Sequence, residues 1–170
     1  MIHIHSRPWY FKKKIYQKLE PFLDSLVELI SKKYKQALRA IVIFGSFARG
    51  EVTLGSDLDV LIILKKTDRR FRERLRDFNN EISTNINGEF SLPLSPLIIT
   101  ENEVFEFNSL LLEIFESQWI IYDDGIFKEV MKWIGKLIED GIVQKRITNG
   151  QTSWRIKYEE EIARRLPGAI

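Results

Sequence analysis

Two apolar runs constrain the fold of this chain more than any other feature of its sequence. The first covers residues 40–44 and reads Ala-Ile-Val-Ile-Phe, and the second covers residues 58–64, which are apolar except for Asp59. Continuous runs of β-branched and aromatic residues are typical of strands buried on both faces, because a strand with one solvated face alternates apolar and polar residues. We therefore expect an α/β fold, in which a small mixed sheet is flanked by helices.

Three other stretches have apolar residues at helical spacing. They cover residues 9–38, 69–82 and 127–138. Pro21 can occupy the first turn of a helix, so it divides the first stretch into a short leading helix and a longer second one. The chain therefore alternates between helix and strand.

Two further strands and a hairpin are predicted in the second half of the chain. Residues 94–99 and 119–122 are short apolar runs that indicate strands. Asn149-Gly150 separates residues 143–148 from residues 151–156, and this dipeptide favours the two-residue type I′ turn of a β-hairpin.

Polar residues at the ends of these stretches match helix-capping patterns. Thr67 and Asp68 are candidate N-caps for the second predicted helical stretch. Thr100 and Glu103 have the spacing of a capping box, which predicts that a helix starts immediately after the third strand. Two aspartates before Gly125 suit a turn and a helix cap, namely Asp123 and Asp124.

The length and composition limit the domain organisation and the kinds of site. With 170 residues, of which 44% are hydrophobic, we expect a main domain over residues 1–124 and a C-terminal helix and hairpin extension over residues 125–170. The chain has no cysteine, which excludes thiolate chemistry, and its two histidines, His3 and His5, make an incomplete metal site. Carboxylates and hydroxyls must therefore carry the chemistry.

The charge and the hydropathy pattern limit the partners and the location. The net charge of +2 does not by itself indicate a nucleic-acid-binding protein. No apolar run approaches the roughly 18 residues that cross a bilayer, and residues 1–10 lack the apolar stretch of a secretory signal. We expect a cytoplasmic protein without a membrane partner.

The segment between the two buried runs carries the most informative residues. Gly45 follows the first run, and Ser46 opens a short helix whose free backbone N–H groups and positive dipole end favour a bound phosphate. Asp57 and Asp59 stand two residues apart at the start of the second run, so their side chains project to the same face. The sequence therefore predicts a phosphate-binding turn beside a pair of carboxylates.

A site made of oxygen ligands alone suits Mg²⁺ or Mn²⁺ and does not suit zinc. Two such ions about 4 Å apart can activate an incoming hydroxyl and neutralise a leaving pyrophosphate during in-line attack at an α-phosphorus. Arg49 and Ser56 are further candidates for contacts with the nucleotide, although Arg49 is also compatible with a plain surface role.

Gly45-Ser46, ten intervening residues and then Asp57-Leu58-Asp59 resemble the signature of the DNA polymerase β-like nucleotidyltransferase superfamily. Residues 45–50 and 56–61 are similar to minimal nucleotidyltransferases of bacteria and archaea, some of which act as antitoxins beside HEPN-type partners. The likeness covers roughly residues 38–124. It implies a nucleotidyltransferase fold, ATP or another nucleoside triphosphate as substrate, and a HEPN-type protein as a candidate partner.

One position departs from the pattern of this superfamily, which usually supplies a third carboxylate from a later strand. Ser95 stands where we align this acid, and its hydroxyl is a poor substitute for an anionic Mg²⁺ ligand. Glu89 and Glu101 are candidates for a relocated ligand. The sequence leaves open a relocated ligand, a weakened enzyme and a nucleotide-binding relic.

Two other features have an open interpretation. Trp154 and Tyr158 suit either base stacking or packing of the hairpin. A local group of cations after the second buried run suits either the steering of a polyanionic substrate or a solvated helix face. These cations are Lys65, Lys66, Arg69, Arg70, Arg72, Arg74 and Arg76.

We therefore predict a nucleotidyltransferase that moves a nucleoside monophosphate from ATP to a hydroxyl acceptor. Gly45 and Ser46 position the triphosphate, and Asp57 and Asp59 bind Mg²⁺ as the catalytic pair. A protein tyrosine, a small molecule or an RNA end can be the acceptor. The alternative is a non-catalytic, antitoxin-like module that uses the same surface to hold a nucleotide or a HEPN-type protein.

Overall fold

A computed structural model describes residues 14–53, 55–86, 92–106, 109–148, 151–157 and 162. Its main sheet has four strands in the order β3-β2-β1-β4. β1 is antiparallel to β2 and β4, whereas β2 and β3 are parallel. The strands are β1 (Leu38–Phe44), β2 (Leu58–Leu64), β3 (Leu94–Thr100) and β4 (Gln118–Asp123). The predicted α/β fold with a small mixed sheet is confirmed.

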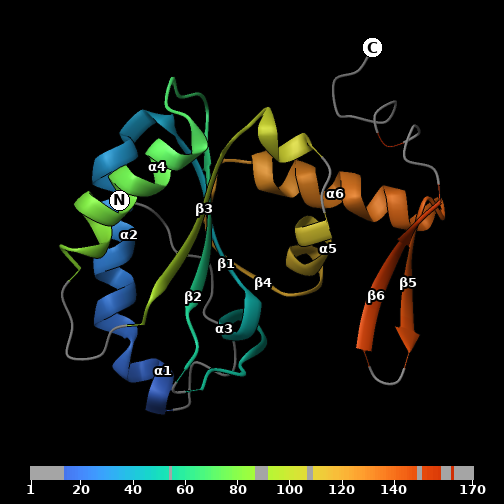
Figure 1. The fold of residues 1–170 in the computed structure, drawn as a ribbon, viewed down its shortest axis with the longest axis horizontal. Helices are drawn as coiled ribbons and strands as arrows, with labels where there is room; N and C mark the ends of the chain where they lie inside the picture. Colours follow the sequence, from blue (N-terminus) through green and yellow to red (C-terminus); the bar gives the residue numbers. More distant parts are fainter. Residues whose placement is uncertain are drawn as a thin grey trace.

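Helices cover both faces of this sheet (Figure 1). Of the larger helices, α2 (Glu20–Tyr34) and α4 (Phe71–Phe78) lie on one face, whereas α5 (Ser109–Glu116) and α6 (Ile126–Glu139) lie on the other. The side chains of β1 and β2 alternate between the two cores. Arg39 in β1 and Asp59 in β2 are the only residues of these two strands that are not buried.

The first helical stretch ends earlier than its apolar pattern predicts. Pro21 does lie in the first turn of α2, after a short helix α1 (Lys14–Lys18). The helix then gives way to a 3₁₀ turn, η2 (Lys35–Ala37), and Leu38 already pairs with Leu64 in the sheet. The prediction of helix up to residue 38 is wrong at this end, because strand pairing captures Leu38. Residues 9–13 lie outside the described part of the chain.

The N-terminal cap of α4 also differs from the prediction. The hydroxyl of Thr67 accepts a hydrogen bond from the Arg69 N–H at 3.1 Å, which is a turn before the helix. The cap is supplied by Glu73, whose Oε2 accepts from the backbone N–H of Arg70 at 2.9 Å. Thr67 and Asp68 are therefore not the caps, because the helix starts later, at Phe71. It continues beyond Phe78 as a π-helical turn, η3 (Asn79–Ser83).

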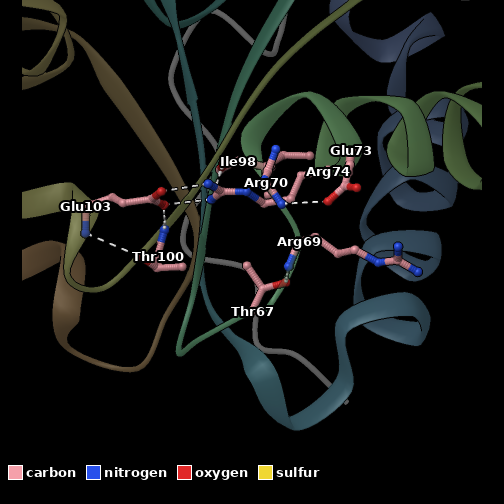
Figure 2. Close-up of polar contacts among 8 residues, drawn as sticks. All are labelled: Thr67, Arg69, Arg70, Glu73, Arg74, Ile98, Thr100 and Glu103. Carbon is pink, nitrogen blue, oxygen red and sulfur yellow. Dashed lines mark hydrogen bonds and ion pairs between the residues drawn. The ribbon is translucent and has the colours of Figure 1, made fainter.

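The capping box after β3 is confirmed, but it starts only a short 3₁₀ turn, η4 (Glu103–Phe105). The Thr100 N–H donates to Glu103 Oε2 at 2.7 Å, and the Glu103 N–H donates to Thr100 Oγ1 at 3.3 Å. The same carboxylate binds the buried guanidinium of Arg74 through both oxygens, at 2.6 and 2.7 Å (Figure 2). Arg74 also donates to the Ile98 carbonyl at 2.8 Å, so this network ties α4 to β3.

The C-terminal helix and hairpin follow the prediction. Asp123 caps α6, because its Oδ1 accepts from the Gly125 and Phe127 N–H groups at 3.0 and 2.9 Å. Asp124 does not cap this helix; it pairs with Arg39 at 2.6 Å. The hairpin consists of β5 (Val143–Thr148) and β6 (Gln151–Ile156), and its Asn149-Gly150 turn lies outside the described residues.

The described C-terminal residues share a hydrophobic core with the sheet. Phe127 of α6 and Val143 of β5 are fully buried in the cluster that contains Ala40 and Val42 of β1. The division at residue 124 stays a prediction. In the part of the chain that is described, every helix is too short or too polar to cross a bilayer.

Candidate active site

Strand pairing brings the end of β1 and the start of β2 together at one edge of the sheet. Phe44, the last residue of β1, pairs with Asp59 of β2 on one side and with Gln118 of β4 on the other. The next residue, Gly45, therefore lies beside Asp59, although fourteen positions separate them in the sequence. This arrangement joins the predicted glycine turn to the predicted carboxylates.

Gly45 touches Asp59 so closely that no side chain fits between them. A Cβ atom at position 45 would overlap Asp59 Oδ2 and would lie 3.0 Å from its Cγ. The backbone of Gly45 also has a φ of +68°, a conformation that favours glycine. Both constraints require glycine here, and the close contact places the Asp59 carboxylate against the start of the helix that follows.

That helix, α3 (Gly45–Arg49), is a single short turn that the core holds in place. Phe47 is fully buried and stacks on Trp119 of β4, with 6.3 Å between the ring centroids. Ser46 is half-buried, whereas Arg49 is exposed and its Nε lies 2.8 Å from Glu51 Oε2. The helix therefore presents Ser46 and Arg49 near the carboxylates, on a rigid base.

Asp57 and Asp59 form a pair of like charges, and neither forms an ion pair with a cation among the described residues. Burial raises the pKa of Asp59, and the negative charge of Asp57 raises it further. A hydrogen bond with Ser95 and the positive charge of Arg49 act in the opposite direction. Asp57 itself is exposed. A pair of carboxylates that repel each other at the surface is suited to a bound cation.

Ser95 lies directly beside Asp59, at the position where the aligned third acid was expected. β2 and β3 are parallel, with Asp59 opposite Ser95 in their register. Ser56, by contrast, supports a local turn: its Oγ accepts from the Thr53 N–H at 2.9 Å. A direct contact of Ser56 with a nucleotide stays a prediction.

The structure separates the candidates for the missing acid. Glu101 is not a candidate any longer, because it follows the far end of β3 and binds Arg39 at 3.2 Å. Glu101 is six positions after Ser95 along an extended strand, which corresponds to about 20 Å. Glu89 lies outside the described residues.

Glu113 on α5 is the acid that the sequence analysis missed. Its negative charge also raises the pKa of Asp59, although less than burial and the charge of Asp57 do. Asp59 lies on the same face of β2 as Leu61 and Ile63, whose side chains pack into the core beneath α5 and α6. This is the face of the sheet on which α5 carries Glu113. In the sequence, Glu113 could have been noticed as the single charged residue within the otherwise apolar residues 110–115.

The residues at this edge fit Mg²⁺ in their chemistry. All the donors are oxygens: the carboxylates of Asp57 and Asp59, with the hydroxyl of Ser95 beside them. Within the described ranges, no three acidic, histidine or cysteine residues gather closely enough to form a complete metal cage. A pair of carboxylates suits Mg²⁺, which takes its remaining ligands from phosphates and water.

The model of the nucleotidyltransferase domain family matches residues 23–165, which is most of the chain. The chain belongs to this family. The match extends beyond residues 38–124, where the resemblance of the motifs lies, and it includes most of the C-terminal extension.

Two proteins of Methanocaldococcus jannaschii are similar to this nucleotidyltransferase. One, named "Putative protein adenylyltransferase MJ1305", is 27% identical over 144 residues, which cover 81% of this chain and 94% of that protein. The other, named "Putative protein adenylyltransferase MJ0604", is 39% identical over 44 residues, which cover 26% of this chain and 44% of that protein.

Among solved structures, one named "Crystal structure of a putative nucleotidyltransferase from Sulfolobus solfataricus at 1.40 A resolution" is 19% identical, with a TM-score of 0.43 over 71% of this chain and 92% of that chain. A toxin-antitoxin structure with AMP-PNP is 12% identical, with a TM-score of 0.45 over 69% of this chain and 90% of that chain.

Proposed function

We propose that this nucleotidyltransferase transfers AMP from ATP to a hydroxyl group of a protein, with Mg²⁺ held by Asp57 and Asp59. One observation carries the proposal: the Asp59 carboxylate packs against the backbone of Gly45, so a phosphate-binding turn and a carboxylate pair share one edge of the sheet. The names of the two archaeal relatives support a protein as the acceptor. The use of ATP is consistent with a cytoplasmic location.

The chain's own residues bind and orient the reactants in this proposal. The backbone of Gly45 and the hydroxyl of Ser46 hold the triphosphate, and Arg49 contacts it from the end of α3. When bound, Mg²⁺ supplies positive charge that neutralises the phosphate oxygens and the departing pyrophosphate. The acceptor oxygen forms a bond to the α-phosphorus while the bond from that phosphorus to the pyrophosphate oxygen breaks. The hydroxyl proton is released to water.

Incubation with ATP labelled at the α-phosphate tests this reaction. We expect label to enter acceptor protein in a lysate of the source cells and pyrophosphate to be released, both only with Mg²⁺ or Mn²⁺. ATP labelled at the γ-phosphate is the control and should leave the acceptor unlabelled. Label from the γ-phosphate in the acceptor would instead indicate a kinase.

A specific observation favours the non-catalytic alternative, a module that binds a nucleotide or a HEPN-type partner. Ser95 occupies the strand position beside Asp59 where an acid would complete the metal site. If the protein is an active but weakened enzyme, Ser95→Asp should raise the transfer rate by about tenfold, because it adds an anionic ligand. A protein that binds ATP but stays inert with and without Ser95→Asp would support the binding module.

A further inference from the structure

The β5–β6 hairpin carries positive charge that the proposed reaction does not use. Residues 143–157 contain four cations and no acid. Three apolar residues of one face pack into the core shared with α6, namely Val143, Trp154 and Ile156. The register places Lys145 opposite Trp154, so this cation belongs to the packed face. It pairs with Glu116 at the end of α5.

The opposite face of the hairpin presents two arginines to solvent. Arg146 pairs with Ser153 in the register and Arg155 pairs with Gln144, so both arginines project from the face that the core does not use. Both are exposed, and no carboxylate among the described residues forms an ion pair with either. We call this the arginine face, defined by Arg146 and Arg155.

The positions of these two arginines have an electrostatic cost for the isolated fold. They are diagonal neighbours across the two strands, a relationship that places Cβ atoms about 7 to 8 Å apart. Like charges at neighbouring positions of a sheet repel each other. An anion bound between the two arginines would relieve this repulsion. The packing of the hairpin does not explain the two charges, because the arginines lie on the face that does not pack into the core.

The hairpin extends toward the end of the molecule where α3 lies. Figure 1 shows it descending from the end of α6 to the level of α3, the helix that begins at Gly45. The ion pair from Lys145 reaches Glu116, two residues before Gln118, and Gln118 pairs with Phe44 at the edge of the active site. A protein that offers its hydroxyl to this edge can therefore also meet the hairpin.

We propose that the arginine face binds an acidic, extended segment of the protein that accepts the AMP group. This inference rests on the proposed function, which takes a protein as acceptor. A guanidinium binds a carboxylate through two parallel hydrogen bonds. Alternate side chains of an extended segment lie about 6.8 Å apart, close to the diagonal spacing of the arginines. The segment should therefore carry carboxylates at alternate positions.

A nucleic acid fits this face less well. Proteins that bind duplex DNA commonly contact about 6 to 10 phosphates, whereas this face offers two arginines. Single-stranded nucleic acids are held by aromatic side chains on which the bases stack. Trp154 lies on the packed face, so the arginine face has no aromatic residue among those whose side chains are described.

Fluorescence anisotropy with a labelled ten-residue peptide of alternating glutamate and serine tests the proposal. We expect the double variant Arg146→Gln and Arg155→Gln to weaken peptide binding about tenfold at low salt. The matched control is Arg70→Gln with Arg72→Gln, which removes the same charge from exposed positions around α4. It should change the affinity less than about twofold.

Several outcomes would overturn the proposal. Undetectable peptide binding or an equal loss in both double variants would remove the arginine face as a specific site. Tighter binding of a ten-nucleotide deoxyadenosine strand, with the same dependence on Arg146 and Arg155, would make it a nucleic-acid surface. Three glutamates at residues 159–161 lie outside the described residues. If their replacement by glutamine strengthens peptide binding more than tenfold, the chain's own carboxylates occupy the face.

Calorimetry with ATP and Mg²⁺ on the same samples separates this inference from the proposed function. The hairpin variant should bind ATP as the unchanged protein does, because its arginines are outside the active site. Absence of ATP binding in the unchanged protein, with intact peptide binding, would count against the proposed function alone. Intact ATP binding without peptide binding would overturn the hairpin inference alone.

Discussion

The two ends of β1 and β2 arrange their charges in opposite ways. At the end that contains the start of β1, Arg39 binds Glu101 and Asp124, and Arg74 binds Glu103. At the other end, Asp57 and Asp59 repel each other, and the Asp59 carboxylate occupies the space where a side chain at position 45 would stand. The first arrangement satisfies its charges within the protein, whereas the second leaves a charge for a ligand to neutralise. In our proposal, the charges that stabilise the fold and those that bind the ligand therefore lie at opposite ends of one sheet.

The largest effect is expected from removing the unpaired charges. Asp57→Asn with Asp59→Asn should lower the transfer rate by at least about a thousandfold and abolish the Mg²⁺ dependence of ATP binding, because the carboxylates place the metal. Calorimetry and the α-phosphate label measure both quantities. The double variant should stay folded, and unchanged metal-dependent affinity would remove the metal role from these residues.

Removing a paired charge should instead affect stability. Glu103→Gln leaves the guanidinium of Arg74, which is 6% exposed, without its counter-charge, and we expect a loss of about 2 to 3 kcal/mol in the free energy of unfolding. Urea unfolding at pH 7 measures it. Glu101→Gln is the matched control at the same end and should cost less than about 1 kcal/mol, since Asp124 still pairs with Arg39. A loss of ATP affinity in Glu103→Gln would contradict the separation of the two ends.

A comparison of two glycines with nearly the same φ separates the effect of the contact with Asp59 from the effect of backbone strain. Gly45 has a φ of +68° and Gly141 a φ of +71°, but a Cβ at position 141 would meet nothing closer than 3.7 Å. Alanine at either position should cost about 1 kcal/mol in stability from backbone strain.

Only Gly45→Ala should also weaken ATP binding, by about 30-fold or roughly 2 kcal/mol, because it displaces the Asp59 carboxylate. Ser46→Ala, which removes one hydrogen bond, should lose about 1 kcal/mol of ATP affinity. Calorimetry on the three variants gives the order. Equal ATP affinities for Gly45→Ala and Gly141→Ala would show that this turn does not cradle phosphate.

The smallest expected effect concerns the pH dependence of stability, to which the two ends of the sheet contribute with opposite sign. The Arg74 guanidinium lowers the pKa of Glu103 to about 2, so its contribution to stability is present above the ordinary carboxyl pKa and is lost as the pH falls toward 2. The pKa of Asp59 is raised in the folded protein. Its ionisation therefore destabilises the fold as the pH rises from the ordinary aspartate pKa through the raised one.

Urea unfolding between pH 3 and pH 7 separates these contributions. Asp59→Asn should gain stability at pH 7 by less than about 1 kcal/mol, because this partly solvated carboxyl is screened by water. In Glu103→Gln, the free energy of unfolding should fall less steeply below about pH 4.5 than in the unchanged protein, because the carboxylate that becomes protonated there is missing. Destabilisation by Asp59→Asn at pH 7 would mean that the unoccupied protein stabilises this charge.

Local patterns in the sequence predicted the strands, most of the helices and most residues of the candidate site. Apolar runs predicted β1 and β2 because both faces of these strands are covered. The hairpin strands also had their predicted bounds, since Asn-Gly sets a register by itself. The spacing of Gly45, Asp57 and Asp59 was enough to propose a phosphate-binding turn and a carboxylate pair.

Contacts between distant residues decided the rest. Leu38 is a strand residue because it pairs with Leu64, and the capping box at Thr100 starts only a short turn while its Glu103 side chain binds Arg74. Glu101 looked close to the site along the chain, yet the length of β3 carries it to the opposite end. Glu113 comes near Asp59 only because α5 packs over that face of the sheet. Local propensity acts over a few residues, whereas strand pairing and ion pairs join residues that the sequence order keeps apart, so only the tertiary structure determines them.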